Sequence, residues 1–267
     1  MKGNSRMKVA LVLALAAGAI LGILLTMLVA KKSINQKEQA FASEKTELMT
    51  ENQELQEQVR VMQEAEEKKE NAQMLASDDE DWSLALINEE YPLDTSYVPE
   101  LEELETDKYV DKRIIEDAKQ MLSEAEAAGM QMLICSAYRS YEKQRETFDD
   151  TMLEWMYQGY SPLDAYDETK KSVAVPGTSE HAAGLALDIT SALYTELDER
   201  QAETEEAKWL EENCWKYGFI LRYPPEKASV TGIIYEPWHY RYVGKEAAKE
   251  ITEQGITLEE YVNFSEN

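Results

Sequence analysis

The sequence predicts an α+β domain with a small antiparallel sheet and flanking helices, preceded by a transmembrane helix and a helical stalk. Three features lead to this prediction: an apolar N-terminal run, a long polar segment after it, and mixed helix and strand patterns in the remainder. Strands and helices do not alternate regularly there, which favours an antiparallel sheet. We therefore divide the chain into residues 1–32, 33–80 and 81–267.

The first segment is predicted to anchor the protein in a membrane. Residues 9–30 are uncharged, and as a helix rising ~1.5 Å per residue they span about 33 Å, enough to cross a bilayer core. A cleavable signal peptide would have a shorter apolar run and a small residue where Leu28 stands. We expect an uncleaved single-pass anchor with the domain on the extracytoplasmic side, because the short N-terminus is basic and the bulk of the chain is acidic.

Residues 33–80 are predicted to form a helical or coiled-coil stalk, because they are rich in Glu, Gln and Lys and contain no Pro or Gly. Apolar residues recur every seven positions, at Ile34, Phe41, Leu48, Leu55 and Met62. The companion positions that a two-stranded coiled coil needs are mostly polar. A homodimer through the stalk, a single solvated helix and a partly disordered spacer therefore all stay open.

The secondary structure of the third segment is predicted from the periodicity of apolar residues, and glycines and prolines mark the ends of the individual helices and strands. We expect a strand entry at 82–87, helices at 112–128, 141–159 and 205–217, and strands at 130–136, 184–190, 219–223 and 233–242, the last interrupted by Pro237.

Charge and cysteine content narrow the classes of partner. Most of the net charge of −26 lies after residue 80, and so acidic a domain repels phosphate backbones; we expect no nucleic acid partner. A peptide remains compatible, because one local cation can hold its carboxylate. Cys135 and Cys214 could form a disulfide or bind zinc, but their apolar or helical surroundings favour two buried free thiols.

The only two histidines of the chain indicate a metal site, because each lies near a carboxylate. Neutral imidazole with carboxylate suits catalytic zinc. His181 and Asp188 are separated by a segment containing Gly184, and a turn there followed by a strand would bring both side chains to one ion. A histidine near an aspartate is usually structural, so spacing alone leaves a metal site and two structural histidines about equally open.

The second histidine segment adds His239 and a further carboxylate, Glu236. On a regular strand these two side chains would face opposite ways, but Pro237 favours a bulge that would aim both into one cleft. If His181, Asp188 and His239 hold zinc, a fourth position is left for water, and Glu236 is the general base that takes its proton.

These segments resemble the VanY-like D-alanyl-D-alanine carboxypeptidases, a group of zinc peptidases. The resemblance covers about residues 81–250, and its blocks appear in the expected order: W-x4-I-N-x3-P-L at 82–93, S-A-Y-R-S-Y-x2-Q at 136–144, V-P-G at 175–177, S-E-H-x2-G-x3-D at 179–188, Y-G-F-I-L-R-Y-P at 217–224 and E-x2-H at 236–239. It implies a Hedgehog/DD-peptidase-like fold.

The resemblance also implies roles for individual residues. His181, Asp188 and His239 would hold one zinc ion, with Glu236 as the general base. Arg139 is similar to the family arginine that binds the substrate's terminal carboxylate or the developing oxyanion, and its planar guanidinium suits either role. A surface ion pair is the alternative. We further expect substrate contacts from Tyr138, Gln144, Ser179 and Trp238, with turn capping or packing as the alternative in each case.

Together these expectations describe a membrane-anchored zinc carboxypeptidase that removes the C-terminal D-alanine from peptidoglycan stem peptides. L,D-carboxypeptidase action on tetrapeptide stems is the nearest alternative. A catalytically silent cell-wall-binding module is a more distant one, and Glu236 argues against it because a structural zinc site needs no additional base.

Overall fold

The computed structural model describes residues 80–265 continuously and short pieces between residues 26 and 75. The chain divides into two units, Met1–Met62 and Gln63–Asn267. Most of the predicted span at 9–30 and most of the predicted stalk lie outside the described residues, so both stay predictions. Within the described part of the chain, no helix has the length and apolar character needed to cross a membrane.

A four-stranded antiparallel sheet lies at the centre of the domain and confirms the predicted α+β class. Its strand order is β3 (Met132–Ser136), β4 (Ala186–Ser191), β6 (His239–Tyr242) and β5 (Phe219–Leu221). Every residue of β4 is buried, including the polar residues Asp188, Thr190 and Ser191.

A separate hairpin, β1 (Leu101–Glu105) and β2 (Lys108–Asp111), was not predicted from the sequence. It turns through Asp107, which has a φ of 61°. The end of β2 packs on Gly184, whose carbonyl accepts a hydrogen bond from the Asp111 N–H at 3.0 Å. The hairpin thereby supports the turn that leads into β4.

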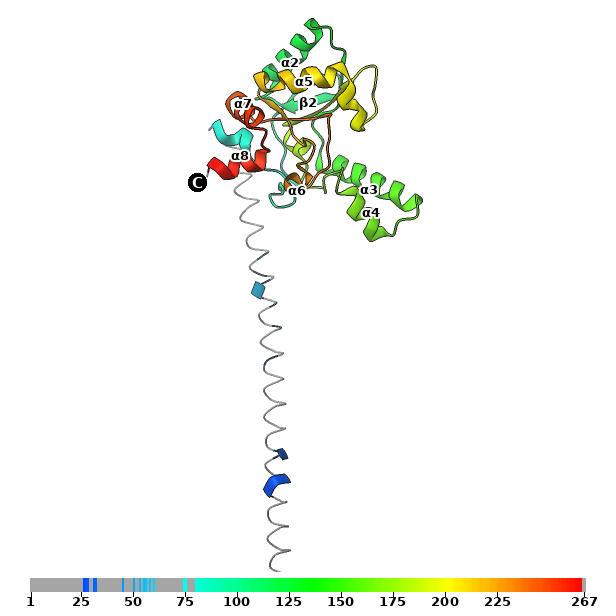
Figure 1. Ribbon diagram of the computed structural model, residues 1–267, viewed down its shortest axis with the longest axis vertical. Helices are drawn as coiled ribbons and strands as arrows, with labels where there is room; N and C mark the ends of the chain where they lie inside the picture. The colour runs from blue at the N-terminus through cyan, green and yellow to red at the C-terminus, as the bar shows by residue number, and fades with distance from the viewer. Residues whose placement is uncertain are drawn as a thin grey trace, which may run out of the picture. The chain divides into compact units, whose positions relative to one another are not determined.

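Helices lie around the sheets, and two of them, α3 (Tyr141–Tyr157) and α4 (Pro162–Thr169), pack on each other and project to one side of the domain (Figure 1). The α-helices are α2 (Ile115–Ala127), α3 (Tyr141–Tyr157), α4 (Pro162–Thr169), α5 (Glu205–Asn213), α6 (Ala228–Thr231), α7 (Lys245–Gln254) and α8 (Leu258–Ser265). Short 3₁₀ helices are η1 (Glu80–Leu84), η2 (Glu180–Ala183), η3 (Glu199–Glu203) and η4 (Cys214–Tyr217). The helix predicted at 205–217 is thus α5 followed by η4, while α4, α6, α7 and α8 were not predicted.

Two predicted strands are wrong in whole or in part. Residues 82–87 do not form a strand, because η1 lies there. The carbonyls of Ser83 and Ala85 accept hydrogen bonds from the side-chain Nη2 of Arg241 rather than from the backbone of a neighbouring strand. The predicted strand at 233–242 is a strand only from His239 onward, because Pro237 lies in a turn that precedes β6.

The main hydrophobic core lies around α2, β4 and β6 and includes Ile114, Met121, Leu187 and Tyr240. It also includes Leu75, which is 2% exposed and whose carbonyl accepts a hydrogen bond from Arg113 Nη1 at 2.9 Å. Packing of the domain therefore begins before residue 81. A smaller apolar cluster joins α7 and α8 to β5.

Both cysteines are free thiols, as expected from the sequence. Cys214 is buried, whereas Cys135 is only half-buried and lies with its Sγ 3.2 Å from Thr190 Oγ1.

Gly184→Ala is expected to destabilise the fold by about 2–4 kcal/mol, because the turn requires a φ of 69° and an added Cβ would lie 2.7 Å from the Asp111 nitrogen. Gly255→Ala is the matched control: its φ is 63°, but nothing lies within 4 Å of an added Cβ, so only the backbone penalty of about 1–2 kcal/mol is expected. Urea unfolding of both variants measures the difference. Equal losses would contradict the close approach of β2 to Gly184.

Candidate metal centre

The turn after η2 places His181 beside Asp188. Gly184 ends η2 in the left-handed conformation, and β4 begins two residues later. His181 Nε2 then lies 3.1 Å from Asp188 Oδ2, and both side chains are buried. This is the arrangement expected from the glycine between them.

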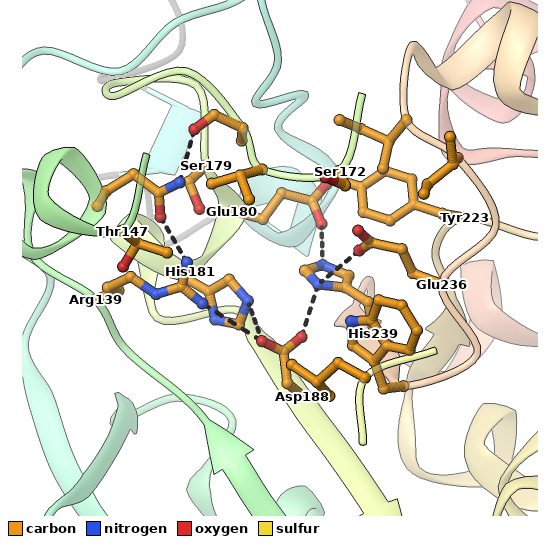
Figure 2. A pocket seen from close by; sticks show the side chains of 17 residues that line it. Arg139, Thr147, Ser172, Ser179, Glu180, His181, Asp188, Tyr223, Glu236 and His239 are labelled. Carbon is orange, nitrogen blue, oxygen red and sulfur yellow. Dashed lines mark hydrogen bonds and ion pairs between the residues drawn. The ribbon is translucent and has the colours of Figure 1, made fainter. Parts of the chain in front are cut away.

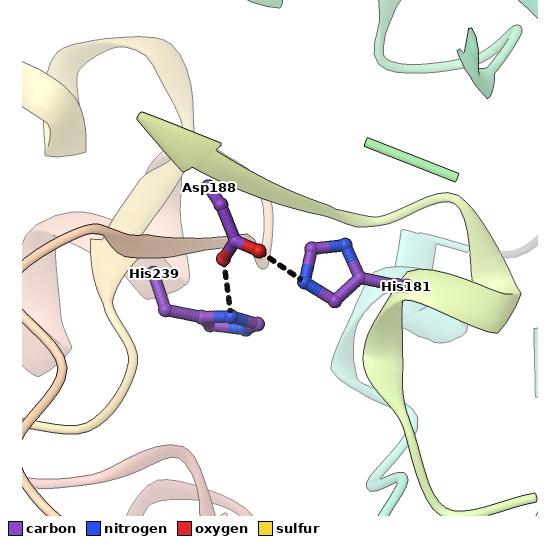
Figure 3. A group of neighbouring side chains, drawn as sticks. All are labelled: His181, Asp188 and His239. Atoms are coloured by element: carbon purple, nitrogen blue, oxygen red, sulfur yellow. Dashed lines mark hydrogen bonds and ion pairs between the residues drawn. The ribbon is translucent and has the colours of Figure 1, made fainter. Parts of the chain in front are cut away.

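The register of β4 and β6 brings His239 to the same aspartate. His239 is paired with Asp188 across the two strands, and its Nδ1 lies 3.0 Å from Asp188 Oδ1. The potential ligand atoms of His181, Asp188 and His239 all lie within 4.8 Å of one another (Figure 3). The structure thus unites the three predicted ligands, one from η2 and two from neighbouring strands.

Each imidazole is oriented by a hydrogen bond on its far nitrogen. His181 Nδ1 donates to the Ala137 carbonyl at 2.7 Å, and His239 Nε2 donates to Glu180 Oε2 at 3.2 Å. Nε2 of His181 and Nδ1 of His239 are therefore left to face the metal position. Such partners are usual for metal-binding histidines, and two imidazoles with one carboxylate are a ligand set of catalytic zinc. The residues present fit a zinc ion.

Electrostatics in the metal-free protein also fit a cation. Burial lowers the pKa of His181 and so favours the neutral imidazole that a metal needs. Burial would raise the pKa of Asp188, but the two imidazoles outweigh it and hold that pKa well below its usual range. Burial likewise opposes protonation of His239, yet its hydrogen bonds to Asp188 and Glu180 raise its pKa to about 9. In the metal-free protein, a proton on His239 thus provides the positive charge that a metal would supply.

Glu236 lies beside His239, and its carboxylate accepts no hydrogen bond from the described residues. Its Oε2 is 3.9 Å from His239 Nδ1. The turn that Pro237 introduces is closed by the His239 N–H donating to the Glu236 carbonyl at 3.1 Å, which keeps both side chains on one side. Burial raises the pKa of Glu236 to about 8. This carboxyl group can therefore exchange a proton near neutral pH.

Arg139 lies on the opposite side of Asp188 from His239 (Figure 2). Its Nη2 contacts Ser136 Oγ at 2.9 Å and Asp188 Oδ2 at 3.4 Å, and its Nη1 donates to Gln144 Oε1 at 2.8 Å. The side chain is only 16% exposed, so it is not the surface ion pair considered as an alternative. Arginine has five N–H donors, so these contacts leave donors for a ligand.

The ligands line a cavity of about 280 Å³ together with Arg139 and Glu236. The predicted substrate contacts Gln144, Ser179 and Trp238 also line it, whereas Tyr138 does not. Gln144 is buried and its Nε2 donates to the Ala174 carbonyl at 2.7 Å, so its amide bridges Arg139 to the cavity wall. The remaining wall consists of Thr147, Ser172, Val173, Ala174, Glu180, Leu197, Tyr223, Ile233 and Ile234.

A buried charge network behind His239 was missed from the sequence. Glu180 Oε1 accepts hydrogen bonds from Arg222 Nε at 2.6 Å and Arg241 Nη1 at 2.7 Å. Burial opposes the charge on Glu180, but both arginines hold its pKa well below the usual range. Glu180 lies in the family-like block at 179–188 and Arg222 in the block at 217–224. Membership in these blocks is the one sequence signal that could have pointed to the two residues.

The family model described as VanY, D-alanyl-D-alanine carboxypeptidase, matches residues 107–245. The chain belongs to the VanY family. The VanY-family chain is 43% identical over 186 residues to the D-alanyl-D-alanine carboxypeptidase of Enterococcus faecalis, covering 70% of this chain and 68% of that relative.

Two solved structures are similar to this VanY-family chain. One is a variant of the vancomycin resistance D,D-pentapeptidase VanY in complex with Zn(II): the TM-score is 0.62 at 42% identity, over 68% of this chain and 99% of the other. The second is the LdcB LD-carboxypeptidase: the TM-score is 0.60 at 38% identity, over 70% of this chain and 88% of the other. The family and the α+β fold predicted from the sequence are confirmed.

Zinc binding is expected to release a proton from His239, because the ligand must be neutral and its pKa in the metal-free protein is about 9. Because a proton on His239 competes with zinc, the zinc affinity falls about tenfold for each pH unit below 9. Titration calorimetry of the Glu236→Gln variant at pH 7, in buffers of different ionisation enthalpy, counts the protons released without a contribution from Glu236, whose pKa also falls when zinc binds. Binding without proton release would show that His239 is already neutral.

The same shift bears on the stability of the metal-free fold. Because the pKa of His239 is raised from 6.5 to about 9, its contribution to stability is fully present below pH 6.5 and is lost as the pH rises through 9.

Proposed function

We propose that this chain is a zinc-dependent carboxypeptidase that removes the C-terminal D-alanine from peptidoglycan stem peptides. The observation that carries the proposal is the additional carboxylate of Glu236, which accepts no hydrogen bond from the described residues and lines the same cavity as the His181, Asp188 and His239 cluster. A structural metal site would have no use for it. The E. faecalis relative bears the name of this activity, and the similar VanY structure contains Zn(II).

His181, Asp188 and His239 would hold the zinc ion. When bound, zinc polarises a scissile carbonyl and makes water nucleophilic near neutral pH. Glu236 takes a proton from the attacking water and delivers it to the leaving amine. Its position at the cavity wall and its pKa near 8 in the metal-free protein suit both transfers, although the charge of a bound cation lowers that pKa.

Arg139 supplies the local cation that an anionic substrate needs in an acidic domain. Its remaining N–H donors can bind the terminal carboxylate of the peptide or the oxyanion that develops at the scissile carbonyl. Gln144 and Ser136 hold the guanidinium in place at 2.8 and 2.9 Å. Apolar side chains in the same wall, Trp238 and Ile233, provide surface for the methyl groups of alanine.

L,D-carboxypeptidase action on tetrapeptide stems is the second candidate. The similarity to the LdcB LD-carboxypeptidase, at 38% identity, favours it. D,D-carboxypeptidase activity is the first candidate, because the matched family and the similar relative from E. faecalis both carry the D-alanyl-D-alanine carboxypeptidase name.

Membrane attachment and an extracytoplasmic domain belong to the same proposal. The uncharged run at 9–30, with basic residues on both sides, supports a single-pass anchor. Residues 33–80 would hold the domain away from the bilayer, and the heptad positions within them support a homodimer only weakly.

The activity is tested by incubating the zinc-loaded chain with pentapeptide and tetrapeptide muropeptides and following the loss of alanine by mass. Loss from the pentapeptide is expected, and Glu236→Gln should keep zinc but lose at least ~100-fold in rate. Glu250→Gln, an exposed carboxylate on α7, is the matched control and should retain full rate. Loss from the tetrapeptide alone would move the enzyme to the L,D class, and zinc binding without turnover would favour the wall-binding module.

Anchoring is tested by fractionating cells that express the full chain or a variant lacking residues 1–32. The full chain should stay with membranes after an alkaline wash and enter solution only with detergent, whereas the truncated variant should be soluble. Release of the full chain by the wash would contradict a membrane-spanning anchor.

A further inference from the structure

A chain of buried charged groups leads from His239 to the C-terminal helix α8. Glu180 Oε2 lies 3.2 Å from His239 Nε2, and Oε1 of the same carboxylate lies 2.6 Å from Arg222 Nε. The other edge of the Arg222 guanidinium binds Glu259 of α8, with Nη1 to Oε2 at 2.9 Å and Nη2 to Oε1 at 2.5 Å. Glu259 does not line the cavity, so it reaches the metal site only through two other side chains.

This arrangement fixes the direction of the Glu180 carboxylate. Arg222 and Arg241 both bind Oε1, which leaves Oε2 directed at His239. Arg241 is anchored independently, because its Nη2 donates to two backbone carbonyls of the η1 region. In the described part of the chain, the Nη groups of Arg222 donate hydrogen bonds to Glu259 alone.

The four groups also balance one another in charge. Glu180, Arg222 and Arg241 are at most 1% exposed and Glu259 is 8% exposed, so water does little to screen them. Removing one partner of a buried ion pair leaves an uncompensated charge. Without Glu259, two arginines would face the single carboxylate of Glu180 and draw it away from His239.

We propose that Glu259 is a positioning residue of the metal site: by holding Arg222 it fixes the Glu180 carboxylate that orients His239, and so strengthens zinc binding. The proposal rests on the zinc binding included in the proposed function. Loss of an outer partner of a metal-binding histidine typically weakens metal affinity about 10–100-fold. Because Glu259 acts through two side chains, the lower end, about tenfold, is expected.

The test measures the zinc Kd of the purified full chain by competition with a chromophoric chelator at fixed pH. Glu259→Gln should raise the Kd about tenfold. Glu260→Gln is the matched control, because this neighbouring carboxylate on α8 binds Lys227 at 2.8 Å outside the network. It loses the same charge from the same helix, and its Kd should stay within about twofold of the wild-type value. A wild-type Kd for Glu259→Gln would overturn the proposal.

A double variant distinguishes positioning from a general loss of structure. If Glu259 acts through Glu180, adding Glu259→Gln to Glu180→Gln should leave the Kd of Glu180→Gln unchanged, since residues in one network are not additive. Additive losses would mean that Glu259 acts by another route. A wild-type chain without zinc affinity would instead contradict the proposed function itself.

Unfolding of each metal-free variant is measured alongside, to show that it is folded. If Glu259→Gln does not fold, Arg222→Leu combined with Glu259→Leu replaces it, because exchanging a whole buried ion pair for apolar side chains is often tolerated. This variant also releases Glu180 and should raise the zinc Kd at least ~10-fold. An unchanged Kd in the folded double-leucine variant would likewise overturn the role of Glu259.

Discussion

Two arginines, Arg222 and Arg241, are buried in this domain with almost no access to water, and the carboxylate of Glu180 lies between them and His239. Removing ions from water is costly unless each finds a partner with good geometry. Arg222 directly follows β5, Arg241 belongs to β6 and Glu180 begins η2, so these three parts of the chain must meet at one point. The requirement to pair these charges therefore helps fix the register of the sheet that carries the metal ligands.

The period of two along β6 connects this requirement to the hydrophobic core. His239 and Arg241 face one side of the strand and meet Glu180, whereas Tyr240 and Tyr242 face the other side and pack in the main core. A shift of the strand by one residue would bury charged groups among apolar ones and expose the tyrosines to the cavity side. Stability of the core and geometry of the site are thus set by the same register.

The sequence predicted the metal ligands because histidine is rare in this chain and both copies lie in family-like blocks. It also predicted the strand β4, which follows the turn at Gly184. The hairpin at 101–111 was missed because its strands are largely charged and bury only Val110 and Asp111, so they show no apolar alternation. The buried network was missed for a different reason: arginine and glutamate are rarely buried, and only the fold brings Glu259 next to Arg222.

Two of the ligands come from η2 and β4, which are adjacent in the chain, but the third comes from β6, where His239 lies 51 residues beyond Asp188 and meets it only when the two strands pair. An unfolded chain therefore offers no preformed place for the ion, and long-range strand pairing has to precede capture of the metal. Folding is slow in domains dominated by such non-local contacts. The ion is consequently acquired where the sheet closes, and the zinc available at that place determines how much of the protein carries its metal.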